Sequence, residues 1–196
     1  FRERSIPESI ELLHAASAEA GDDPHVRARA ELELTFASVS VSFDFDAAGP
    51  HAEATRHYAE QAGDRALVAE ALAVTVMLDF LLGRGLDRAK LERSLELEVP
   101  DHDAAIEVHP TLIAGLLSFY VDDYDASRRH LYSLTRRLRD RGQDGDLPVL
   151  LAHTAWMECL SGRIEAAGEL AEEAIELAAL SESATWAQPA ISGNRI

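Results

Sequence analysis

The chain has 196 residues, of which 47% are apolar and 27% are charged, and its formal net charge is −17. This length suits one ordinary domain or one short repeat array, and the apolar content supports a buried core, which excludes an intrinsically disordered chain. A chain this acidic repels nucleic-acid phosphates, so we expect this segment to make no direct contact with nucleic acid.

The first half of the sequence predicts five helices. The first covers about residues 7–20, and the second begins at Pro24, where Asp23 caps the helix and proline takes the first helical position. Gly63 and Gly83 stand near helix ends, where a left-handed residue is favoured. The remaining helices of this half are predicted over residues 50–62, 65–82 and 87–98.

One stretch of this half, from Val39 to Asp46, alternates strictly between apolar and polar residues, which is the signature of a strand. Leu32, Phe36, Val39 and Phe43 also fit a helical stripe. No second strand is evident, and a lone strand is not stable. We therefore expect a helix followed by an irregular loop.

The second half predicts four helices, over residues 109–121, 124–141, 146–161 and 164–180. The last two form the clearest unit, in which Asp146 is placed to cap the first helix and Gly162 ends it. The second helix of the unit is amphipathic, with an acidic face predicted to lie in water. The acidic residues are Glu165, Glu169, Glu172, Glu173 and Glu176.

Small residues recur where the second helix of each pair would cross the first. Close crossing needs small residues at the contact, and a period of about 40 residues indicates a helical solenoid. The first set is Ala52, Ala89, Ala126 and Ala167, which are 37, 37 and 41 residues apart. A second small residue follows seven positions later at Ala59, Ser133 and Ala174, whereas Glu96 breaks the pattern after Ala89.

These patterns predict an all-α fold. We expect an α-solenoid of antiparallel helix pairs, with a right-handed, tetratricopeptide-like superhelix, as a single helical-repeat domain over residues 1–196. Residues 183–196 are predicted to be the start of a truncated repeat or a disordered tail. The chain begins at Phe1 rather than Met, which indicates a fragment of a larger protein. The predicted repeats cover residues 24–62, 65–98, 109–141 and 146–180.

Motifs for catalysis are missing from the sequence. The only lysine, Lys90, follows Ala89, so there is no Walker A loop to hold phosphates, and no Gly-x-Ser-x-Gly elbow occurs. No two histidines are four residues apart, so no helix carries a His-x-x-x-His metal pair. Asp101, His102 and Asp103 could hold a cation, but a solvated acidic loop is the favoured interpretation. We predict a protein that is not an enzyme and has no cofactor and no metal site.

The predicted helix over residues 124–141 is basic in an otherwise acidic chain. An anion or an acidic partner could bind there. Compensation of the helix dipole, together with surface ion pairs, explains the same residues and is the favoured interpretation. The arginines are Arg128, Arg129, Arg136, Arg137, Arg139 and Arg141.

The first helix of each pair is expected to line the inner groove of the solenoid. Exposed aromatic rings there would bind an apolar ligand or a peptide, whereas the alternative is that they fill the core between repeats. Glu158 and Asp79 interrupt apolar helices and could be groove acceptors or could point to water. The inward-facing residues are Thr111, Ser118, Phe119, Val149, Ala152, Trp156 and Cys159. The candidate ligand or partner groove consists of Phe119, Tyr120, His153 and Trp156.

Cys159 is the only cysteine, so the chain can form no intrachain disulfide, which agrees with a reducing cytosol. No apolar run reaches the roughly 18 residues that a membrane-spanning helix needs. No signal peptide is visible. We expect a cytoplasmic protein that makes no contact with a membrane.

Three stretches carry a family resemblance: Ala71–Leu86 (ALAVTVMLDFLLGRGL), Phe119–Ala126 (FYVDDYDA) and Leu147–Leu180. They resemble the tetratricopeptide-like region of large actinobacterial LuxR-family transcriptional regulators, the MalT-like proteins with an ATPase module and a C-terminal helix-turn-helix. The similarity covers roughly residues 24–182. Neither a phosphate-binding loop nor DNA-binding helices lie in this chain, so the resemblance assigns both to other parts of a parent protein.

The resemblance implies a regulatory sensor and protein-interaction module of such a regulator. Its expected partners are an unknown small-molecule or peptide effector and the other domains or subunits of the parent. The alternative is a generic tetratricopeptide adaptor that binds a peptide or protein and has no connection to transcription.

Overall fold

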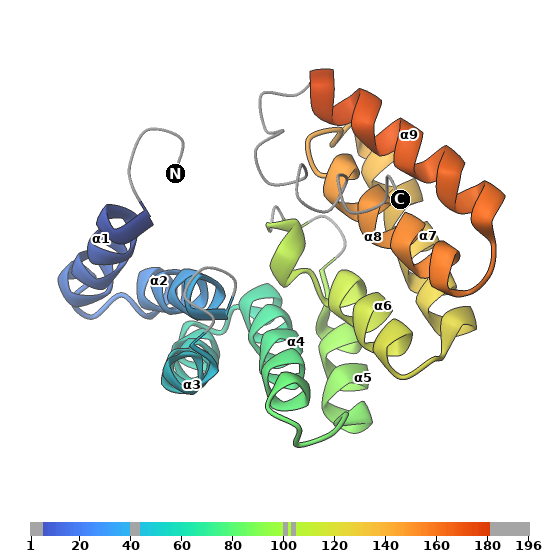
Figure 1. Cartoon of the computed structure of the whole chain (residues 1–196). Coiled ribbons are helices and arrows are strands. Elements are labelled where there is room, and N and C mark those ends of the chain that lie inside the picture. Colours follow the sequence, from blue (N-terminus) through green and yellow to red (C-terminus); the bar gives the residue numbers. More distant parts are fainter. Residues whose placement is uncertain (1–5, 40–43, 100–101, 103–104, 181–196) are drawn as a thin grey trace. The chain divides into compact units, whose positions relative to one another are not determined.

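The structure, a computed structural model, describes residues 6–39, 44–99, 102 and 105–180. Every regular element among them is a helix, which confirms the all-α prediction (Figure 1). Within the same residues, no helix is both long enough and apolar enough to cross a membrane. The elements are α1 (Ile6–Glu19), α2 (Pro24–Ala37), α3 (Phe45–Ala62), α4 (Arg65–Leu81), α5 (Arg88–Leu97), the short 3₁₀ helix η2 (Ile106–Val108), α6 (Pro110–Tyr120), α7 (Tyr124–Arg141), α8 (Leu147–Leu160) and α9 (Ile164–Leu180).

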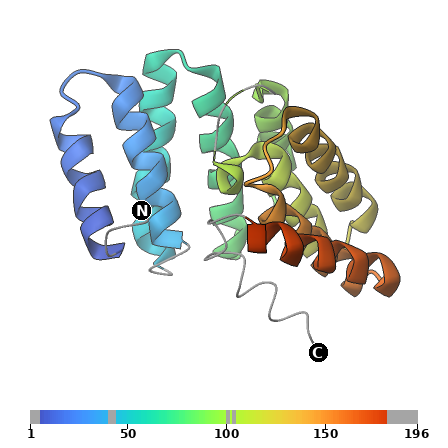
Figure 2. The ribbon, with the colours of Figure 1, turned by 90° about the horizontal axis from the view of Figure 1, so that it is seen from above.

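The chain divides into an N-terminal unit, Phe1–Pro110, and a C-terminal unit, Thr111–Ile196, and each is described by itself. In the N-terminal unit, each helix from α2 to α5 packs against the helix that precedes it (Figure 2). In the C-terminal unit, α8 packs against both α7 and α9. The single domain, its four repeats and the solenoid stay predictions, and residues 183–196 lie outside the described part of the chain.

Aspartates begin many of the described helices. The side chain of each of these residues accepts a hydrogen bond from a backbone N–H of the first turn, which satisfies a donor that the helix itself leaves unpaired. The capping residues are Asp23, Asp44, Asp64, Asp87 and Asp123. Asp23 confirms the predicted start of α2.

Asp146 was expected to cap α8 in the same way, and that prediction was wrong. Its side chain makes no capping hydrogen bond, and its backbone has the helical values φ −93° and ψ −17°. The helical backbone of Asp146 explains the difference, because a capping side chain reaches the N–H groups of the first turn from a non-helical backbone.

Left-handed residues end helices at the predicted places. Glycine adopts this conformation without the steric cost that a Cβ brings. Asp122, with φ 62°, takes the same role between α6 and α7, 40 residues before Gly162 between α8 and α9. The predicted glycines Gly63, Gly83 and Gly162 all have positive φ, from 66° to 84°, and Gly142 at the end of α7 has φ 66°.

The start of α3 differs from the prediction. The helix begins at Phe45, five residues before Pro50, and Asp44 caps it by accepting a hydrogen bond from the N–H of Ala47. The start predicted at residue 50 was therefore wrong, and Pro50 lies inside α3. Of the alternating stretch, Val39 is helical and Phe45 belongs to α3, while residues 40–43 lie outside the described residues.

Most of the predicted crossing residues are buried, which agrees with close helix packing. Ala52, Ala59, Ala167 and Ala174 are each at most 7% exposed. Ala89 is exposed, so the crossing predicted there was wrong. In α5 the crossing residue is instead Ser94, which is fully buried and donates a hydrogen bond to the carbonyl of Ala69 at 2.9 Å. Ala89 lies in the first turn of α5, on the side that faces water.

Candidate functional site

Four aromatic residues meet in the C-terminal unit and are called the aromatic cluster: Phe119 and Tyr120 at the end of α6, Tyr124 at the start of α7, and Trp156 in α8. The ring centroid of Trp156 lies 5.1 Å from that of Phe119 and 6.4 Å from that of Tyr120, both edge to face. Such pairs add about 0.5–1.5 kcal/mol beyond their buried area. The structure therefore brings together three of the four residues predicted for the groove.

The aromatic cluster has a buried base and an exposed face. Phe119 is only 6% exposed, whereas Tyr120 and Trp156 are each 40% exposed. Burial raises the pKa of the Tyr120 hydroxyl, so this group lies in desolvated surroundings although part of the side chain faces water. Two half-exposed rings fixed by a buried third can contact an apolar ligand with little loss of side-chain freedom.

His153, the fourth predicted residue, precedes Trp156 by one turn of α8, so the two side chains lie on one side of the helix. Burial lowers the pKa of the His153 imidazole, which is therefore neutral at neutral pH. A neutral imidazole can donate one hydrogen bond and accept another. On the same side, one turn beyond Trp156, Leu160 is 56% exposed and extends the apolar surface.

The other residues predicted to face the groove divide between core and surface. Thr111 and Ala152 are buried, and Cys159 is exposed. Thr111 accepts a hydrogen bond from Nη2 of Arg137 at 2.8 Å, and it therefore helps to hold α6 to α7.

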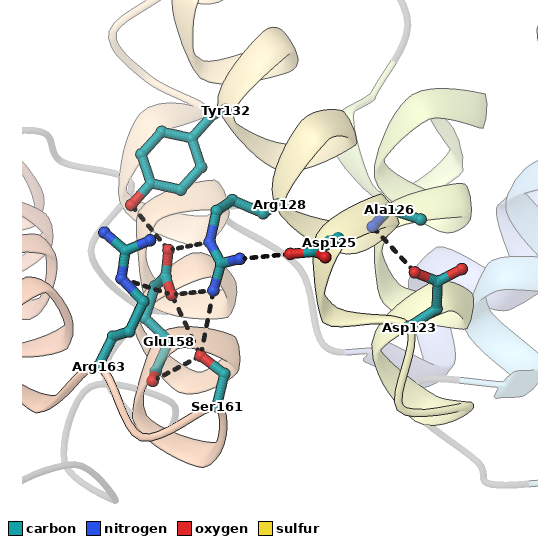
Figure 3. Close-up of polar contacts among 8 residues, drawn as sticks. All are labelled: Asp123, Asp125, Ala126, Arg128, Tyr132, Glu158, Ser161 and Arg163. Carbon is teal, nitrogen blue, oxygen red and sulfur yellow. Dashed lines mark hydrogen bonds and ion pairs between the residues drawn. The ribbon is translucent and has the colours of Figure 1, made fainter.

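A second group of polar residues, absent from the predicted site, surrounds Glu158 (Figure 3). The Glu158 side chain is completely buried in α8. Its carboxylate accepts hydrogen bonds from Nε and Nη2 of Arg128 at 2.9 and 2.8 Å, and from the hydroxyl of Tyr132 at 3.0 Å. The hydroxyl of Ser161 donates a hydrogen bond to Oε2 of Glu158 at 3.2 Å, and Nε of Arg163 lies 3.6 Å from the same oxygen. We call these five residues the Glu158 network.

The Glu158 network keeps its carboxylate ionised. The hydrogen bonds from Arg128 lower the pKa of Glu158, against the effect of burial, and the Tyr132 hydroxyl adds to the lowering. The network therefore joins α7, α8 and the turn before α9. The expectation that Glu158 accepts a ligand's hydrogen bond in a groove or points to water was wrong, because residues of this chain surround it.

The remaining charged candidates also have partners within the chain. Arg139 pairs with Glu173, and Arg128 also pairs with Asp125 at 3.1 Å, which favours ion pairs as the explanation of the basic helix. Asp79 pairs with Arg84 at 2.8 Å.

The predicted cation site can be followed only at His102, whose Nε2 lies 3.2 Å from Oε1 of Glu70, because Asp101 and Asp103 lie outside the described residues. Across the described part of the chain, no group of three or more histidine, cysteine, aspartate or glutamate residues is placed to hold a metal ion.

No family model matches this chain, and no curated protein matches it in sequence. The described residues therefore define a structural class, an all-helical protein. The surface feature with the clearest chemistry is the exposed face of the aromatic cluster, which can contact an apolar group.

Proposed function

We propose that this chain is the sensor and interaction module of a LuxR-family transcriptional regulator, with ATP binding and DNA binding in parts of the parent outside this chain. The observation that carries the proposal is the aromatic cluster, a half-exposed apolar surface on a helical scaffold. The stretches Ala71–Leu86 and Leu147–Leu180, which resemble such regulators, support it. The proposed role is cytoplasmic and needs neither catalysis nor a cofactor.

The scaffold in this proposal is a tetratricopeptide-like solenoid. The 40-residue separation of the left-handed residues Asp122 and Gly162 supports a helix-pair repeat, as do the buried small residues of α3 and α9. In a solenoid each repeat contacts only its neighbours, so stability is spread along the array and its curvature changes at low cost.

The proposed ligand is an apolar small molecule or a short peptide with an apolar anchor. Its anchor would stack on Trp156 and Tyr120, and the neutral imidazole of His153 would supply a polar contact. Binding shifts the conformation only by the difference in affinity between two shapes of the module. That shift would alter the contacts of the module with the rest of the parent, which couples two distinct sites.

The test is Trp156→Ala in the full-length regulator. We expect this variant to keep the helical circular dichroism of the wild type and to lose the transcriptional response to its effector. Leu12→Ala is the matched control, because Leu12 is 45% exposed on α1 in the other unit, and this variant should respond normally.

Two outcomes of that experiment contradict the proposal. A normal response of Trp156→Ala would show that the aromatic cluster is not the binding surface. Unfolding of the variant would show that the cluster belongs to the core. Ligands can be screened with Trp186→Phe, in which Trp156 is the remaining tryptophan and its fluorescence reports binding.

A further inference from the structure

A buried carboxyl group in the N-terminal unit has few partners. Glu70, in α4, is 2% exposed. Its Oε1 lies 3.2 Å from Nε2 of His102, and its Oε2 lies 3.6 Å from Nη1 of Arg29 on α2. Within the described residues, Oε2 of Glu70 and Nε2 of His102 are buried and make no hydrogen bond. Glu70 thus differs from Glu158, which accepts hydrogen bonds from several side chains.

A second carboxyl–imidazole pair faces Glu70 across a small cavity. Glu98 follows α5, and its Oε1 lies 3.8 Å from Nδ1 of His109. Both side chains line the cavity together with Glu70 and His102, and the space holds about one water molecule. The cavity is too small for a ligand larger than a water molecule, but protonation of a side chain requires no additional volume.

The charges around Glu70 favour its neutral form. Burial is the largest effect, and it raises the pKa of Glu70 to about 7 from the ordinary 4.5. Asp64, the cap of α4, and Glu33 on α2 raise it further, and only Arg29 lowers it. The Arg29 side chain is 38% exposed, so solvent screens much of its charge.

We propose that Glu70 and His102 form a proton-binding site that makes the packing of α4 in the N-terminal unit depend on pH near neutrality. A role of the proton as an input to a sensor rests on the proposed function. The existence of the proton-binding site does not depend on that function. Above neutral pH, one proton leaves the Glu70 carboxyl for solvent, and a buried carboxylate is left behind.

The sign of the effect follows from linkage. A carboxyl whose pKa is higher in the folded chain than in the unfolded chain stabilises the fold fully below the unfolded value of 4.5. That contribution is lost as the pH rises through the folded value of about 7. The two values together predict that Glu70 alone lowers the folding equilibrium constant about tenfold between pH 6 and pH 8.

The first experiment is an infrared titration of the full chain. We expect the carbonyl band of a protonated carboxyl that titrates near pH 7 in the wild type and is missing from Glu70→Gln. The control Glu92→Gln, at an exposed position of α5, should keep the band. Arg29→Gln should move the midpoint to higher pH, because Arg29 is the neighbour that lowers the pKa of Glu70. The proposal is overturned if every carboxyl band titrates in the ordinary range, or if the band survives in Glu70→Gln.

The second experiment is hydrogen exchange of the α4 amides at pH 6 and pH 8, corrected for intrinsic exchange rates. Between pH 6 and pH 8, the protection factors of these amides should fall about tenfold more in the wild type than in Glu70→Gln. Equal changes in both proteins would contradict the proposal. Its failure is distinguishable from failure of the proposed function, because the Trp156→Ala test reads the response of the C-terminal unit.

Discussion

Replacing Arg128 with methionine is expected to lower the free energy of unfolding of the C-terminal unit by about 3 kcal/mol. The substitution leaves the completely buried carboxylate of Glu158 without the guanidinium that donates two hydrogen bonds to it. Removing one partner of a buried ion pair costs about 3–5 kcal/mol, and the lower end applies because Tyr132 and Arg163 remain.

The loss can be measured by urea unfolding of the full chain, with Trp156 as the fluorescent reporter in the Trp186→Phe background. Arg129→Met is the matched control, because Arg129 is the exposed neighbour on α7, and it should change stability by less than about 0.5 kcal/mol. The double variant Arg128→Met and Glu158→Met should recover most of the loss, because no unpaired charge stays buried. A loss no larger than that of the control would refute the structural role of the network.

The stability that Arg128→Met loses depends on pH. The pKa of Glu158 is lowered in the folded chain, so its stabilisation is present above the unfolded value of 4.5 and is lost as the pH falls through the folded value. The difference between wild type and Arg128→Met should therefore shrink in acid, where Glu158 takes up a proton.

Replacing Gly115 with alanine is expected to destabilise the C-terminal unit by a net of about 1–2 kcal/mol, which is about 2–3 kcal/mol of overpacking less the gain from the better helix former. A Cβ at this position of α6 would lie 2.6 Å from Cδ2 and 2.9 Å from Cγ of Leu131. Leu131 is completely buried on α7, so its side chain has no free space into which it can move. The overpacking should exceed the gain of about 1 kcal/mol in helix propensity.

Gly168 provides a control of opposite sign. It lies within α9, and a Cβ there would meet no atom within 4 Å. Gly168→Ala should therefore stabilise the chain by about 0.5–1 kcal/mol. Chemical denaturation gives both values, and a double variant with Leu131→Ala should cost less than the sum of the single changes. Stabilisation by Gly115→Ala would show that α6 and α7 do not cross closely at this point.

Local signals in the sequence were sufficient to predict where the α-helices lie. Caps such as Asp23 and left-handed residues such as Gly63 act through the backbone of their own turn, so they can be recognised without tertiary structure. The failures occurred where two local rules compete. Pro50 is acceptable at a helix start, yet α3 begins at Phe45, because Asp44 is the better cap.

The candidate site was predictable only in part. Helical spacing indicated that Phe119 and Trp156 lie on corresponding helices, and their rings are in contact. The partners of Glu158 were not predictable, because Arg128 is 30 residues away and the hydrogen bonds depend on how α7 packs on α8. A usable signal was nevertheless present: Arg128 and Tyr132 are four residues apart and therefore share one side of their helix.

The pKa values of Glu70 and Glu158, both buried, are shifted in opposite directions, and the two residues lie in different units. Loss of a proton from Glu70 weakens the N-terminal unit as a solution becomes alkaline, while uptake of a proton by Glu158 weakens the C-terminal unit as it becomes acidic. These two carboxyls therefore give the stabilities of the two units different dependences on pH. Acid thus lowers the stability of the C-terminal unit relative to the N-terminal unit, and alkali has the opposite effect.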